Sequence, residues 1–493
     1  MRDALLLLVI LMALGVTLRH PFVGIITWAW FTVMTPHQLA YGTYGIPLNL
    51  LIAAVTIGAL IMHGGLGGRI DHSGQRGGQR GGQKSASPPG NQGGNQGASG
   101  GAMSIGDTSI GATGVGIGVL PVMLIIFSFW LFVSQQFSLD AANSAEYFDR
   151  FIKTMAFALI CALTVTTKLR LHALLWTVVV SLGFFAAKGA LFTVATLGQY
   201  RVQGVPTTVL EDNNHMGIAL ATLLPLLLYL RGEVRKPVLR FALTALFVMT
   251  MISILGTHSR GAFLALVAFA AYFWSRSRHK VSIVLALMIV LIPAVAFMPA
   301  KWTERMATIG EATQDASFMG RVDAWVINTK LALANPVTGA GLRNSYEKDI
   351  AKEVDRDRAD SAKAAHSIYF EILGGSGFVG LALYVLLIAA AFFSAQMVMW
   401  RARTTRAPPW QARLALYAQI SLAVFCVGGA SVSLEMWDGY WLIIAMIAAL
   451  STISRRSAAR AGVRRRPRWR ITARGAGRNP ERETGRRQTA GAL

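Results

Sequence analysis

The 493-residue chain is poor in cysteine and in charge, and both shortages narrow its class. Its two cysteines, Cys161 and Cys426, lie inside apolar runs, which excludes a disulfide framework and a cysteine-based metal site. Charged residues make up only 14% of the chain, against about 25% in soluble domains. Hydrophobic residues make up 53%, and mean hydropathy is +0.47. These proportions exclude a string of soluble domains and indicate an integral protein that crosses the membrane many times.

Apolar runs of about 20 residues, the length that spans a bilayer as a helix, recur along the sequence. Two fit between Arg19 and Arg69, where no charged residue intervenes. The others begin near Ala4, Val119, Phe151, Leu171, Met216, Phe241, Gly261, Val281, Ser367, Leu414 and Tyr440. The predicted fold class is therefore all-α, with about 12 to 13 transmembrane helices. Only a short polar break separates the first two runs, so the exact number and the side of the N-terminus stay open.

Basic residues predict the orientation, because short loops rich in Lys and Arg remain in the cytoplasm. Such connections are residues 168–170, 231–236, 276–280 and 401–413, and the tail 454–493 holds 13 arginines against two glutamates. A single alternation places all of them on the inner side. The connections 137–150, 199–215, 257–260, 299–366 and 435–438 then face outward.

Two long connections divide the chain into six segments. These are N-terminal transmembrane helices (1–63), a Gly-rich loop (64–118), further transmembrane helices (119–298), a lid (299–366), C-terminal transmembrane helices (367–453) and the arginine-rich tail (454–493). The Gly-rich loop is expected to be disordered and cytoplasmic, because its composition buries too little apolar surface to fold. The lid mixes acidic and basic residues and is expected to fold outside the membrane, with helices around 321–334 and 345–365.

The basic segments also raise the question of partners. The tail is best explained as a topology determinant or a contact with anionic membrane lipids. The few arginines of the Gly-rich loop are too sparse to favour RNA, and no nucleic-acid partner is expected.

Ionisable groups at a membrane boundary are costly, and so they are candidates for function. On the expected outward side these are Lys188, Arg201, His215, Arg260, Arg321, His366 and Glu371, and the neutral amide of Asn214 lies among them. These residues lie in or next to different connections that are expected on the same side of the membrane, so that folding can bring them together in one site.

The order of several short motifs resembles that of the O-antigen ligase and polymerase superfamily. Residues 257–262 read Thr-His-Ser-Arg-Gly-Ala and are similar to its S-R-G-A turn. Its later motifs are matched by Gly320-Arg321, Trp325, Pro336, Gly339-Ala340-Gly341, Ala365-His366-Ser367, Glu371, Gly377 and Gly380. Lys188-Gly189 and residues 211–215 look like the branch of exosortase-associated O-glycosylation ligases. The resemblance covers most of the chain except the Gly-rich loop and the tail.

This resemblance implies a metal-independent, inverting transfer that needs no cofactor. The donor would be a glycan on a polyprenyl diphosphate carrier, and the acceptor a glycan, lipid or protein on the periplasmic side of a bacterial inner membrane. Guanidinium groups hold phosphate oxygens without being neutralised, and a neutral imidazole accepts a proton. Arg260 and Arg321 are therefore expected to be catalytic cations and His366 the general base. The residues expected to contact substrate are Arg201, Lys188, Asn214, His215 and Glu371.

Simpler interpretations stand beside these. An arginine can mark a membrane boundary, His366 or residues 213–215 can start a helix, and Gly377 and Gly380 can allow close helix packing. Asp355-Arg356-Asp357 has the spacing of a metal-binding D-x-D motif, but a solvated helix face is the preferred interpretation.

Other functions also remain open at this point. A polysaccharide polymerase of the same superfamily would differ only in its acceptor. A flippase for lipid-linked glycans is less favoured, because transporters commonly contain paired repeats and no convincing repeat is present. A non-catalytic scaffold is a third possibility.

Overall fold

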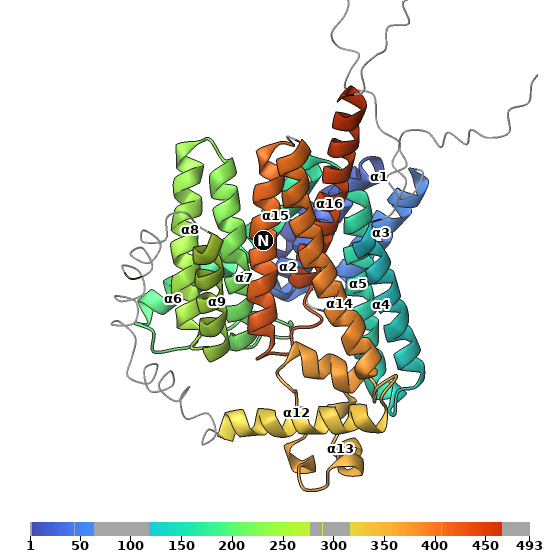
Figure 1. Cartoon of the computed structure of the whole chain (residues 1–493). Coiled ribbons are helices and arrows are strands. Elements are labelled where there is room, and N and C mark those ends of the chain that lie inside the picture. The colour runs from blue at the N-terminus through green and yellow to red at the C-terminus, as the bar shows by residue number, and fades with distance from the viewer. Residues whose placement is uncertain are drawn as a thin grey trace, which may run out of the picture.

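Every regular element in the described part of the chain is a helix (Figure 1). This computed structural model describes residues 2–43, 45–63, 118–276, 288, 316–405 and 407–465. Its α-helices are α1 (Arg2–Arg19), α2 (Pro21–Met34), α3 (Leu48–Met62), α4 (Val119–Gln136), α5 (Ala141–Thr164), α6 (Lys168–Ala195), α7 (Asn213–Glu233), α8 (Pro237–Gly256), α9 (Arg260–Arg276), α12 (Ala316–Ala334), α13 (Lys348–Val354), α14 (Ile368–Thr405), α15 (Pro409–Gly429) and α16 (Asp438–Arg465). Short 3₁₀ helices are η1 (Pro36–Gln38), η2 (Tyr41–Thr43), η5 (Asn344–Tyr346) and η6 (Ala359–Ser361).

Seven of these helices are long and apolar enough to cross a membrane, namely α4, α6, α7, α8, α14, α15 and α16. The all-α, polytopic fold class is thus confirmed. The runs expected near Ala4, Phe151 and Gly261 correspond to α1, α5 and α9, and those between Arg19 and Arg69 to α2 and α3. The run near Val281 and the segments 64–117 and 466–493 lie outside the described residues. The last helix, α16, continues past the expected boundary at residue 453.

Burial separates central helices from lipid-facing ones. Every residue of α7 from Met216 to Leu230 except Leu228 is buried, and Phe425 of α15 stacks on Tyr440 of α16 with ring centroids 4.1 Å apart. A helix that is apolar on all sides is expected at the centre of a bundle. On the peripheral helices, by contrast, large apolar side chains point outward, with Phe241 76% and Phe393 74% exposed. This exposure suits a surface solvated by lipid tails.

The basic connections gather at one end of the bundle. Lys168 lies 3.6 Å from Glu233 and stacks over Trp410 at 5.2 Å, and Arg413 pairs with the same Glu233. Gln411 bonds Ser457 near the start of the arginine-rich tail. We call this the basic end, and the opposite end, which carries α12 and α13, the lid end (Figure 1). Their separation agrees with the charge pattern from which the orientation is predicted.

The lid folds around a small core of its own. Ile327, Leu331, Ala340, Ala351 and Ala359 form an apolar cluster separate from the main core. The helix expected at 321–334 is found within α12, but the one expected at 345–365 is wrong. That stretch is broken into η5, α13 and η6, because α13 ends at Asp355 in an extended conformation. Asp355 there bonds Lys330 at 2.8 Å and Arg358 at 3.1 Å.

A break in α14 anchors the lid to the bundle. Gly377 adopts φ +71°, a left-handed conformation that suits glycine, and interrupts the helix. The freed carbonyl groups of Gly374 and Gly375 accept hydrogen bonds from the amides of Ala340 (2.8 Å) and Gly341 (3.1 Å). A Cβ atom at Gly377 would lie 2.4 Å from the Val337 carbonyl oxygen. The glycines of the Gly339-Ala340-Gly341 string and of the break in α14 therefore allow the lid backbone to form hydrogen bonds with the backbone of the broken helix.

Candidate functional site

His366 is held in a strained backbone conformation between the lid and α14. Its φ is +46°, which costs a side-chain-bearing residue about 1–2 kcal/mol. The preceding residue is tied down on both sides: Trp325 Nε1 donates to the Ala365 carbonyl at 2.7 Å, and the Ala365 amide donates to Glu371 Oε1 at 2.8 Å. Strain maintained in this way is characteristic of functional sites.

The surroundings of His366 keep its imidazole neutral. Burial, the positive charge of Arg321 and the nearby His215 together lower its pKa to about 4, and burial is the largest cause. Its Nδ1 atom is buried and has no hydrogen-bond partner among the described residues. Arg321 and His366, which are 45 positions apart in the sequence, are thus close enough for the charge of one to act on the other. Their joint role in catalysis stays a prediction.

His215 joins them from the first turn of α7. Asp212 caps this helix by accepting from the amides of Asn214 (2.8 Å) and His215 (3.4 Å). His215 Nδ1 lies 2.6 Å from the Val209 carbonyl oxygen. Because a carbonyl only accepts, Nδ1 carries the proton, and the buried Nε2 keeps a lone pair with no partner in the described chain. We call His366, Arg321, His215 and Asp212 the His366 cluster.

Asn214 and its neighbours also form the start of a helix, which is the simpler interpretation given above for residues 213–215. Asn214 takes part in the cap of α7 through its backbone amide, while Asn213 Nδ2 donates to the Thr257 carbonyl at 2.7 Å. This bond ties the start of α7 to the turn that carries Arg260. The contact of Asn214 with substrate stays a prediction.

Glu371 connects three segments of the lid end. Its Oε1 atom accepts hydrogen bonds from Tyr346 (2.8 Å), Ser433 (2.6 Å) and the amide of Ala365 (2.8 Å). The residue is only 4% exposed. This geometry supports a positioning role for Glu371 next to His366, and direct contact with substrate stays a prediction.

Arg260 opens α9 on a neighbouring turn of the same end. His258, two residues before it, takes φ +54°, and Ser259 Oγ accepts from the Ala262 amide at 3.1 Å. Gly261 packs against Ser431, in the same connection as Ser433, which bonds Glu371. The connection that contains Ser431 and Ser433 therefore links the turn of Arg260 to Glu371, which helps to hold His366. The part of Arg260 in catalysis stays a prediction.

Sequence reasoning missed Arg343 and Glu435. Arg343 has φ +61° and stacks over Tyr147 at 4.0 Å and Tyr346 at 5.3 Å. Glu435 is 2% exposed, and burial followed by the nearby Glu371 raises its pKa to about 8. The only signal for Arg343 in the sequence is its place after the Gly-Ala-Gly motif.

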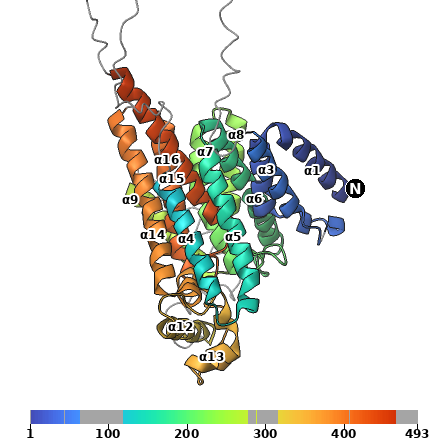
Figure 2. The same ribbon diagram turned by 90° about the vertical axis from the view of Figure 1, so that its right-hand side faces the viewer.

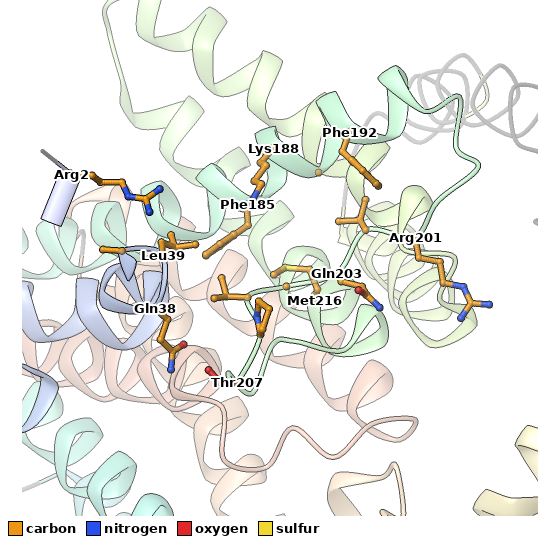
Figure 3. Close-up of a pocket in the computed structure, with 16 residues that line it drawn as sticks. Arg2, Gln38, Leu39, Phe185, Lys188, Phe192, Arg201, Gln203, Thr207 and Met216 are labelled. Atoms are coloured by element: carbon orange, nitrogen blue, oxygen red, sulfur yellow. The ribbon is translucent and has the colours of Figure 1, made fainter. Parts of the chain in front are cut away.

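Lys188 and Arg201 lie elsewhere, in a cavity of about 780 Å³ between the N-terminal helices and α6 (Figure 3). None of His366, Arg321 and His215 lines this cavity. The structure therefore does not bring Lys188 together with the His366 cluster, and Figure 3 shows the Arg201 guanidinium pointing away from Lys188. Their contacts with substrate stay predictions.

No group of three or more His, Cys, Asp or Glu side chains suited to a metal ion occurs within the described ranges. In the D-x-D string, Asp355 is buried rather than on a solvated face, and its oxygens are taken up by Lys330 and Arg358.

Residues 243–385 match the family described as O-Antigen ligase. This segment is similar to an O-antigen ligase domain. This match supports the O-antigen ligase and polymerase superfamily and a membrane function of ligase or polymerase type. Residues 112–234 match a family of unknown function, DUF5935. Among curated proteins, no significant match is found.

The His366 cluster draws on both matched segments. Arg321 and His366 lie in the segment that matches the O-antigen ligase family, as do Arg260, Arg343 and Glu371. Asp212 and His215 lie in the segment that matches the family of unknown function. The two segments are coupled electrostatically, since the charges of Arg321 and His215 both act on His366.

Proposed function

We propose that the protein transfers a glycan from a polyprenyl diphosphate carrier to an acceptor hydroxyl on the periplasmic side of a bacterial inner membrane. The observation that carries this proposal is the neutral, strained His366 beside the fixed cation of Arg321. Donors of this kind leave as a diphosphate, and a fixed cation at the point where that charge develops favours the transition state over the ground state.

The reaction breaks one bond and forms another. The acceptor oxygen attacks the anomeric carbon from the face opposite the diphosphate, so the configuration inverts. The bond between that carbon and the diphosphate oxygen breaks, and the electron pair leaves with the diphosphate. The hydroxyl proton passes to His366, and Arg321, with Arg260, stabilises the leaving group. No metal ion is required in this scheme.

The low pKa of His366 fits this order of events. Before the donor binds, burial and Arg321 keep the imidazole neutral and able to accept a proton. A bound diphosphate next to Arg321 offsets its positive charge, which raises the pKa of His366 toward the ordinary value. The base thus becomes stronger when the donor is in place.

Purified full-length protein and a polyprenyl-diphosphate glycan test the proposal. His366→Ala should lower the rate of glycan transfer by about a hundredfold or more. The matched control is His172→Ala, since His172 bonds Tyr229 at 2.7 Å in the half of α6 nearer the basic end. Equal rates for wild type and His366→Ala, or movement of the lipid across the membrane without any change of product, would reject the proposal. The product separates ligation from polymerisation, because a polymerase lengthens a lipid-linked chain.

A further inference from the structure

The cavity around Lys188 is a second polar space in the protein, and none of the three side chains His366, Arg321 and His215 lines it. It is bounded by Arg2 of α1, residues 38–40, the α6 residues Phe185, Lys188 and Phe192, and the loop 201–207. A volume of about 780 Å³ falls in the usual range for pockets that bind small molecules.

The charged side chains in the lining of the cavity are all basic. Arg2, Lys188 and Arg201 belong to the lining, whereas no Asp or Glu does. Glu211 is nearby, but its Oε2 accepts a hydrogen bond from the Thr207 amide at 2.8 Å. Figure 3 shows the Lys188 and Arg2 side chains directed into the cavity from opposite sides. An amine placed inside a membrane-spanning helix such as α6 is costly and marks a functional site by default.

Neutral polar side chains accompany the basic ones in the lining of the cavity. Gln38 and Gln203 both belong to this lining, and an amide NH₂ group donates hydrogen bonds of the kind that phosphate oxygens accept.

The rest of the lining is apolar, and the cavity adjoins lipid. Phe185, Val202 and Met216 supply the apolar wall, and Phe192 both lines the cavity and is 42% exposed. Neighbouring residues of α6 are exposed as well, with Leu191 at 63%. In the view of Figure 2, α1 and α3 lie at one side of the bundle and end above the level that α4 and α5 reach. A ligand with an anionic head and an apolar tail fits both surfaces.

The loop 201–212 separates this cavity from the His366 cluster. Val205 and Met216 line the cavity. The carbonyl of Val209 accepts the hydrogen bond of His215, which belongs to the His366 cluster. The loop is held by the bonds of the Val202 amide to the Gly256 carbonyl (2.9 Å) and of the Gly204 amide to the Glu211 carbonyl (3.0 Å). A ligand in the cavity therefore does not occupy the proposed place of the donor diphosphate.

We propose that this cavity binds the phosphate head group of a membrane lipid, with Lys188 and Arg2 on the phosphate and Phe185 and Phe192 along the tail. The distinction between this lipid and the glycan donor rests on the proposed function, whereas the binding of the lipid phosphate in the cavity does not. A lipid held here gives the protein places for two phosphorylated lipids at once.

Photolabelling of the full-length protein in nanodiscs tests this site. The probe is a polyprenyl monophosphate that carries a diazirine, and mass spectrometry locates the labelled peptides. We expect labelling within residues 185–207 that excess unlabelled lipid phosphate abolishes. Neither the uncharged polyprenol nor inorganic phosphate at the same concentration should compete. Competition by polyprenol to the same extent would overturn the proposal, and so would competition by inorganic phosphate alone.

Variants make the assignment specific. Lys188→Met should weaken probe binding about tenfold, because a charge-assisted bond is lost, and Lys188→Arg should restore it. Lys153→Met is the matched control, since Lys153 is paired with Asp149 on the surface of α5. If Lys188→Met does not fold, the Arg2→Gln variant tests the same phosphate contact from the opposite wall. Unchanged labelling in whichever of these two variants folds would refute the site.

The proposed function and this site fail in different ways. His366→Ala should abolish transfer and leave labelling of residues 185–207 intact. Transfer that survives in His366→Ala would reject the proposed function, while the labelling result would still decide the cavity.

Discussion

Replacing Glu371 by Ala should misplace His366 without unfolding the protein. The change removes the acceptor of three buried hydrogen bonds. The hydroxyl groups of Tyr346 and Ser433 can rotate toward other acceptors, whereas the amide of Ala365 cannot. Leaving that amide unsatisfied costs about 1–3 kcal/mol.

This cost must be compared with the strain next to it. The left-handed conformation of His366 costs about 1–2 kcal/mol, which the bond of Ala365 to Glu371 helps to offset. Without the bond, a relaxed conformation of residues 365–367 becomes competitive in free energy. The loss is therefore local, and we expect a strong fall in transfer rate with normal amounts of protein in the membrane.

A pH profile separates positioning from general damage. In the wild type, kcat/KM should stay level as pH falls from 7 to 5 and decline around pH 4, where burial and Arg321 have moved the pKa of His366. In Glu371→Ala, a more exposed His366 should bring this decline to higher pH. Glu371→Gln keeps an oxygen acceptor for Ala365 and should retain most of the activity. The reasoning is refuted if Glu371→Ala keeps full activity, or if it loses activity with an unchanged pH profile.

Three further predictions concern other parts of the site. Arg321→Gln should lower the rate of transfer about a hundredfold. Because Arg321 lowers the pKa of His366, the variant should also shift the acidic decline of the residual kcat/KM to higher pH. An unchanged decline would contradict the proximity of Arg321 and His366. His215→Asn keeps a donor for the Val209 carbonyl but removes the Nε2 lone pair, so transfer should fall while thermal stability changes little; wild-type kinetics would exclude a role for that lone pair. Gly377→Ala should loosen the lid, because it adds about 1–2 kcal/mol of backbone strain and a contact of 2.4 Å with the Val337 carbonyl oxygen. Limited proteolysis of residues 336–366 measures the loosening. Resistance equal to that of the wild type would contradict this prediction.

The bundle was predictable because its signal is local. Apolar runs and basic loops each report on their own segment, and the helices α4, α6 and α14 begin close to where their runs predict them. The lid was predictable only in part. A helix was expected through 345–365, but the pairing of Asp355 with Lys330, a tertiary contact, ends α13 early. Local propensity carries no information about such a partner.

The candidate site shows the same division. Motif order and sidedness predict Arg321 and His366 at the same end of the bundle, because they constrain the position of each segment. The separation of Lys188 from His366 could not, since it depends on the path of the loop 201–212 between two spaces on one side of the bundle. Arg343 was missed because its aim depends on a positive φ, which sequence reasoning anticipates for glycine rather than for arginine.

A double-mutant cycle on the rate of transfer tests most directly whether Arg321 and His366 act in one site. The rates needed are those of wild type, Arg321→Gln, His366→Ala and the double variant, at matched protein levels. Residues that stabilise one transition state together are strongly non-additive, so the double variant should be no more than about threefold slower than the slower single variant. A double variant whose loss equals the product of the two single losses would show that they act independently and would contradict the proposed catalytic site.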